Sequence, residues 1–109
     1  MSLRGIEAKI VTDLLVFLAG RGWTPTSIAD EADVVRVQSA GDVMREVGET
    51  ALARVYFARL GRAPVRLERG WVLVIPGNDE DILSDWSDNA LGKDIDAFLQ
   101  SDTFRQAQP

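Results

Sequence analysis

Apolar residues at the start of the chain recur at steps of three and four positions, the spacing of one face of an α-helix. The stripe consists of Leu3, Ile6, Ile10, Leu14, Phe17 and Leu18. Glu7 and Asp13 interrupt the apolar run, so the pattern predicts an amphipathic core helix rather than a membrane span. Gly20 or Gly22, followed by Pro25, supplies the stop signal.

Residues 23–37 favour a β-hairpin, because a polar turn at residues 30–33 lies next to a run of β-branched side chains. These side chains are Val34, Val35 and Val37. Pro25 also suits the first position of a short helix, so residues 23–30 stay open between strand and helix. A helical period returns over residues 39–50, with Val43, Met44 and Val47 on one face.

Strict alternation of apolar and polar residues predicts a half-buried strand over residues 51–60. A turn at 61–64 leads to a second alternating stretch, in which we expect Gly70 to form a bulge. The apolar run 71–75 is predicted to be the central strand of the sheet. A turn at 76–79, a strand at 82–86 and a short helix at 94–99 follow, and residues 102–109 are expected to fray.

The predicted order is therefore α-β-β-α-β-β-β-α, and the fold class is α+β. We expect a single antiparallel sheet of about five strands with helices packed on one face. No linker rich in proline, glycine or serine divides the sequence, so residues 1–109 are predicted to form a single domain.

The second half of the chain reads GWV at residues 70–72, GND at 77–79 and DILSDW at 81–86. This pattern resembles that of small uncharacterised bacterial and prophage-type α+β proteins. The arginine-rich segment 60–69 departs from the pattern. The resemblance implies the order of the strands and no particular chemistry.

The composition argues against catalysis. The chain contains no cysteine and no histidine, which removes thiolate chemistry and the commonest general base and metal ligand. It also lacks a phosphate-binding glycine loop, so we predict a protein that is not an enzyme and needs no cofactor. No stretch has the pattern of a signal peptide, so we expect a cytoplasmic protein that does not contact a membrane.

Charge is unevenly distributed along this acidic chain, whose formal net charge is -5. Carboxylates gather from Asp79 onwards, and their spacing is typical of solvated turns rather than of a metal site. The arginines at 54, 59, 62, 66 and 69, with Tyr56 and Trp71 as stacking partners, are the raw material of a single-strand nucleic-acid site. The net charge disfavours nucleic acid as a partner.

The leading functional hypothesis is a non-enzymatic domain that binds an unidentified protein partner through its acidic C-terminal face or a sheet edge. The candidate interaction residues are Trp86, Asp85, Asp88, Arg66 and Arg69. Trp86 could anchor a symmetric homodimer, with the arginines reaching across to the carboxylates. An acidic decoy that imitates DNA towards a nucleic-acid enzyme, and a small-ligand binder, are the alternatives.

Overall fold

The computed structural model describes residues 3, 5–61, 67–101 and 104. The helices are α1 (Gly5–Ala19), α2 (Ala40–Val47) and α3 (Ala90–Leu99), with a short 3-10 turn η1 (Asp79–Asp81). The strands are β1 (Thr24–Ala29), β2 (Val34–Arg36), β3 (Ala53–Leu60), β4 (Leu67–Val74) and β5 (Leu83–Trp86). The α+β class and the predicted order of elements are confirmed.

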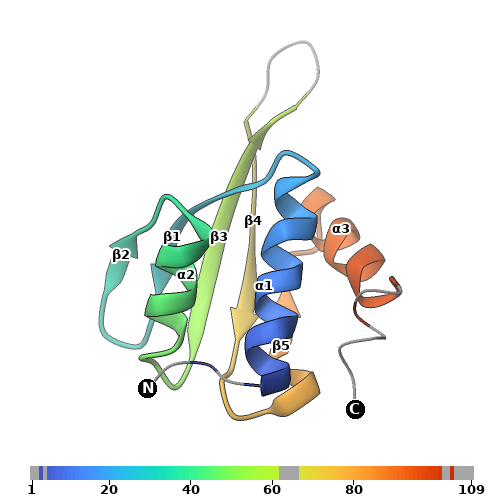
Figure 1. Ribbon diagram of the computed structural model, residues 1–109. Coiled ribbons are helices and arrows are strands. Elements are labelled where there is room, and N and C mark those ends of the chain that lie inside the picture. Colours follow the sequence, from blue (N-terminus) through green and yellow to red (C-terminus); the bar gives the residue numbers. More distant parts are fainter. Residues whose placement is uncertain (1–2, 4, 62–66, 102–103, 105–109) are drawn as a thin grey trace.

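The five strands form one antiparallel sheet in the order β2-β1-β3-β4-β5 (Figure 1). The predicted hairpin at residues 23–37 is present as β1 and β2, so the alternative of a short helix is excluded. The middle position belongs to β3 rather than to the apolar run of β4, although β4 has a neighbour on both sides. The two longest strands, β3 and β4, therefore lie inside the sheet, and the three-residue β2 lies at one edge.

The helices α1, α2 and α3 all lie on the same side of the sheet (Figure 1). Alternate residues of the strands point to that side and close the hydrophobic core, which on β3 and β4 means Ala53, Val55, Phe57, Val72 and Val74. The prediction of helices on one face is confirmed. The opposite face of the sheet carries no helix of the described chain, and we call it the open face.

Gly70 does not form a bulge, contrary to the prediction, because the pairing of β3 with β4 runs without a shift from Ala53 to Leu60. Its role is steric: a Cβ atom there would lie 2.5 Å from Cβ of Leu91 in α3. The register shifts instead occur between Pro25 and Ser27 and where β4 meets β5. Glycine thus lets a helix approach the sheet closely.

The helix α3 begins at Ala90, four residues before the predicted start. The side chain of Asn89 accepts hydrogen bonds from the backbone N–H groups of Leu91 and Gly92, which is a strong N-cap. Most of residues 102–109, which were expected to fray, lie outside the described residues. Phe104 is described, and its ring packs edge-on against Phe98 with ring centroids 5.6 Å apart.

Candidate functional site

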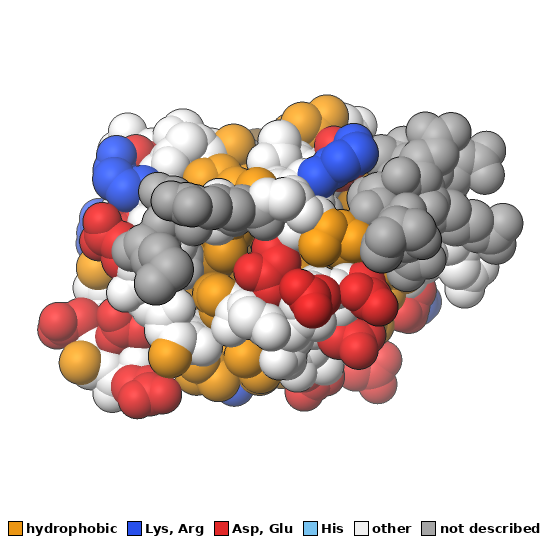
Figure 2. Space-filling model, turned by 60° about the horizontal axis from the view of Figure 1, so that its bottom comes forward, with side chains coloured by type: hydrophobic (Ala, Val, Ile, Leu, Met, Phe, Trp, Pro, Cys, Tyr) orange, Lys and Arg blue, Asp and Glu red, His pale blue; other side chains and the backbone are white. Residues whose placement is uncertain are grey.

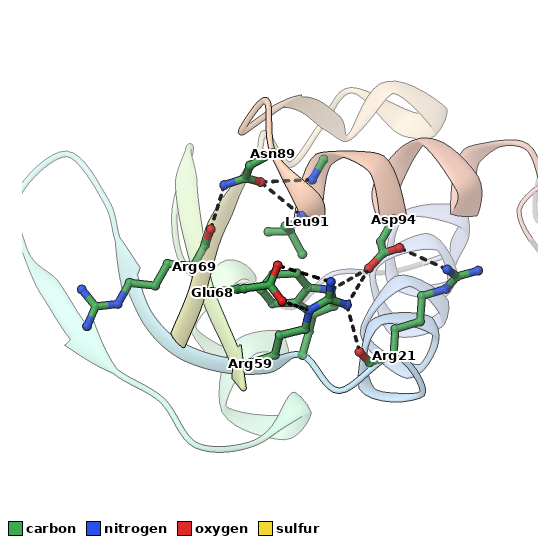
Figure 3. Close-up of polar contacts among 9 residues, drawn as sticks. Arg21, Arg59, Glu68, Arg69, Asn89, Leu91 and Asp94 are labelled. Atoms are coloured by element: carbon green, nitrogen blue, oxygen red, sulfur yellow. Dashed lines mark hydrogen bonds and ion pairs between the residues drawn. The ribbon is translucent and has the colours of Figure 1, made fainter. Parts of the chain in front are cut away.

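Arg59 differs from the other described arginines of the sheet, because its side chain lies on the side of β3 that faces the helices. Its guanidinium group stacks on the buried ring of Trp23, 4.4 Å from the centroid. It also donates to Glu68 at 3.1 Å and to Asp94 at 3.3 Å (Figure 3). Arg59 is therefore part of a packed polar network rather than of a binding strip.

Asp94 is the centre of that network. Its carboxylate, whose side chain is only 13% exposed, accepts hydrogen bonds from Arg21 at 3.1 Å and from the indole N–H of Trp23 at 2.8 Å. Together with Arg59 these contacts join α3 to β3 and to the end of α1 (Figure 3). The charges here are matched, so the network has a structural role.

The open face presents two rows of side chains, because residues paired across antiparallel strands point to the same side. One row runs Arg36, Ser27, Tyr56 and Trp71 across β2, β1, β3 and β4. The next runs Ala29, Arg54, Leu73 and Asp85. Beside the first row, Ala58 pairs with Arg69. Tyr56 and Trp71 are half-buried neighbours in the middle of this surface.

The arginines of the open face differ from Arg59 in their ion pairing. None of the ion pairs formed within the described residues involves Arg36, Arg54 or Arg69. The guanidinium of Arg54 lies over the ring of Trp71, 4.5 Å from its centroid. The side chain of Arg69 points away from the Arg59 network, and its backbone carbonyl accepts a hydrogen bond from Asn89 (Figure 3).

A groove of about 310 Å³ opens on the same face, over β1, β3 and β4. It is lined by Thr26, Ser27, Tyr56, Phe57, Ala58, Leu67 and Arg69. Leu67 and its cross-strand partner Leu60 are 50% and 73% exposed. Solvent-facing leucines beside a groove with an aromatic wall form an apolar surface of the kind that binding sites use.

The described members of the predicted site are divided between the two faces of the sheet and the loop before α3. Trp86 pairs with Val72, faces the helices and is half-buried against the first turn of α3. Asp85 lies on the open face, where its carboxylate accepts from the backbone N–H of Trp86. Asp88 is exposed in the loop before α3, Arg69 lies on the open face, and Arg66 is outside the described residues.

Acidic side chains gather at the end of the molecule that carries η1, which Figure 2 brings forward. The carboxylate of Glu7 accepts hydrogen bonds from the backbone N–H groups of Gly77 and Asp79, at 2.7 and 2.8 Å, and so caps this turn. Within the described ranges no three acidic side chains are grouped closely enough to hold a metal ion. Hydrogen bonds from the backbone to Glu7 stabilise this turn.

Part of the site was visible in the sequence. The alternation in β3 places Arg54 and Tyr56 on one side of the strand. The sequence also indicates Tyr56 and Trp71 as rings on which the bases of a nucleic acid could stack. Arg59 had the same alternation signal, since it follows the buried residues Val55 and Phe57 at even steps. No local sequence pattern predicts the groove or the pairing of Arg59 with Asp94, because both depend on contacts between segments that are distant in the sequence.

No protein-family model, curated protein or solved structure matches this chain. Among the helices of the described residues, none has the length and apolar character needed to cross a bilayer.

Proposed function

We propose that this protein is a non-enzymatic interaction domain that binds a partner protein on the open face of its sheet. The observation that carries the proposal is the coincidence on one helix-free surface of three features. These are the aromatic pair Tyr56 and Trp71, arginines that form no ion pair within the described residues, and the groove bordered by Leu67. Aromatic residues and arginine are the residue types enriched at the centres of protein interfaces.

The chemistry of the chain also favours binding over catalysis. The sequence supplies no histidine or cysteine. The two carboxyl groups with lowered pKa values, Asp30 and Asp42, owe them first to backbone hydrogen bonds, from Asp33 and Gln38 respectively. The carboxylate of Asp30 accepts backbone hydrogen bonds in the turn after β1, that of Asp42 accepts one in the first turn of α2, and neither residue lies in the groove. Their perturbation is explained by local structure rather than by a reaction.

The open face replaces the surface around Trp86 as the proposed interface. Trp86 packs towards α3, where its ring contributes to the core rather than to a sheet edge. A homodimer and an acidic decoy remain alternative hypotheses, which predict contacts at β5 or at the acidic end near η1. A test must therefore report where on the molecule the partner binds, and not only that it binds.

Photo-crosslinking from defined positions gives that test. We would place benzoylphenylalanine at position 56 on the open face and, as a control, at position 16, because Val16 is 67% exposed on α1. In extract from the native host, the variant at Tyr56 is expected to form a discrete adduct with another protein, and the variant at Val16 none. That protein, identified by mass spectrometry and purified, should bind the wild type and lose affinity for Tyr56→Ser.

Each other outcome contradicts the proposal. An adduct of twice the mass of the chain would indicate a homodimer. Adducts only from position 16, or from neither position, would remove the open face as the binding surface. Binding that is indifferent to Tyr56→Ser would do the same.

A further inference from the structure

The charges of the open face point to the chemistry of the partner. We infer that the open face binds an acidic protein segment that carries a large apolar side chain, with carboxylates at Arg54 and Arg69 and the apolar group in the groove. This inference rests on the proposed function and adds the class of ligand to it.

The first step is the separation of charge between the two sides of the sheet. Although the chain has a net charge of -5, the open-face rows hold Arg36, Arg54 and Arg69 against the single carboxylate of Asp85. On the helix side and in the helices, most basic side chains are already paired. Lys9, Arg21, Arg45 and Arg59 each lie within 4 Å of a carboxylate. Among the described arginines, those of the open face are thus the ones without an ion pair, and the charge complementary to them is anionic.

The second step is the geometry of Arg54. Its guanidinium carbon lies over the ring of Trp71, so the indole covers one side of the group. The N–H groups of a guanidinium lie in one plane, and a carboxylate can accept two of them at once. Contact with the ring restricts the Arg54 side chain before a ligand arrives, so less conformational entropy is lost when a carboxylate binds.

The third step is the groove beside these arginines. Arg69 forms part of its lining, together with Tyr56, Ala58 and the half-exposed Leu67. A segment whose carboxylate meets Arg69 would therefore place its neighbouring side chains over an apolar wall. An aromatic or large aliphatic side chain in the groove would bury this surface, which no other part of the described chain covers.

A single-stranded nucleic acid is the competing ligand, since it also combines anionic groups with flat rings. The observations favour the peptide for two reasons. Arg54 already occupies a face of Trp71 on which a base would stack. A long polyanion would also extend beyond the arginines towards Asp85 and an acidic molecule, whereas a short acidic segment need not.

Selection from a random peptide library displayed on phage tests the inference with the intact chain as bait. The wild type is expected to enrich peptides that combine Asp or Glu with an aromatic or large aliphatic residue. A synthetic peptide of the enriched sequence should lose at least about tenfold in affinity for Arg54→Glu or Arg69→Glu. Lys93→Glu is the matched control, because Lys93 is exposed on α3 and the change in net charge is the same. It should leave the affinity within about twofold.

A second pair of variants, Arg54→Gln and Arg69→Gln, keeps the test valid if charge reversal impairs folding, which thermal melting would reveal. These neutral variants should also weaken the acidic peptide, and the peptide should bind less well as salt is added. Loss of affinity only in variants that no longer melt cooperatively would contradict a direct contact.

The remaining outcomes separate the ligand class from the proposed function. Peptides that crosslink from position 56 but lack acidic residues, or that ignore Arg54→Glu, would overturn the acidic ligand and leave the open face as the interface. Peptides that crosslink only from position 16 would overturn both. Tighter binding of oligothymidylate than of the peptide, at an ionic strength of about 0.15 M and in competition with it, would assign the face to nucleic acid. Failure to enrich any peptide would also overturn the inference.

Discussion

Gly92 lies in the first turn of α3 at a point where the structure leaves no room for a side chain. A Cβ atom there would overlap the carbonyl oxygen of Ser87 and lie 3.3 Å from Cδ1 of Trp86. The obstacle is backbone, so relief requires α3 or the preceding loop to move. Overpacking of this kind costs about 3 kcal/mol. Alanine would regain about 1 kcal/mol of helix propensity, which leaves a net loss of about 2 kcal/mol for Gly92→Ala.

Urea denaturation followed by circular dichroism measures this loss, and the melting temperature should fall by on the order of 10 °C. Gly41→Ala is the matched control, because Gly41 is exposed in α2 and the nearest atom to its added Cβ would be Oγ of Ser39 at 3.8 Å. That variant should be stabilised by up to about 1 kcal/mol. If Gly92→Ala were as stable as the wild type, the close packing of α3 against the loop after β5 would be refuted.

Three other predictions follow from burial and hydrogen bonding. Val74→Ala, at a core position that is 1% exposed, should cost about 2 kcal/mol in chemical denaturation, whereas Leu73→Ala on the open face should cost less than about 1 kcal/mol. Asp94→Ala removes the acceptor of the Trp23 indole N–H and of Arg21, and one of the two carboxylates that Arg59 contacts, and should cost about 1–3 kcal/mol by the same assay, while Asp96→Ala on the exposed side of α3 should stay within about 0.5 kcal/mol of the wild type. A backbone N–H and then a guanidinium hold the pKa of Asp42 below its ordinary value, so the stability that this carboxylate contributes is present above the ordinary aspartate pKa and is lost as the pH falls through the lowered pKa. Stability measured across that acidic range should depend less on pH in Asp42→Asn, and an unchanged pH profile would contradict this assignment.

Alternation along the strands predicted the sheet well, because residues of β3 point in turn to the helices and to the open face. The same rule explains the error over the central strand. The run from Trp71 to Ile75 is continuously apolar and indicates burial on both faces, yet Trp71 and Leu73 are half-exposed. The local pattern looks the same whether an apolar residue lies on a covered or an uncovered face of the sheet. The sequence therefore does not distinguish a core strand from one that displays a binding surface.

The candidate site was predictable only in its composition. The arginines, Tyr56 and Trp71 stood out as a group, but the group divides between two faces of the sheet. Arg59 donates a hydrogen bond to Asp94, which lies 35 residues further along the chain. Such a contact depends on how α3 docks onto the sheet, and no spacing rule encodes it. Trp86 lies between polar residues in the sequence, a pattern typical of an exposed position, but its pairing with Val72 turns it towards the core.

The most direct test of the open face as the binding surface uses the three tryptophans as reporters. In protein labelled with nitrogen-15, each indole N–H gives one signal, and Trp71→Phe assigns the signal from the open face. Trp23 and Trp86 lie on the helix side of the sheet. Addition of the partner protein identified by crosslinking should shift or broaden the Trp71 signal in a saturable way and leave the other two unchanged. A partner that perturbs Trp86 while Trp71 stays unchanged would contradict the proposed function.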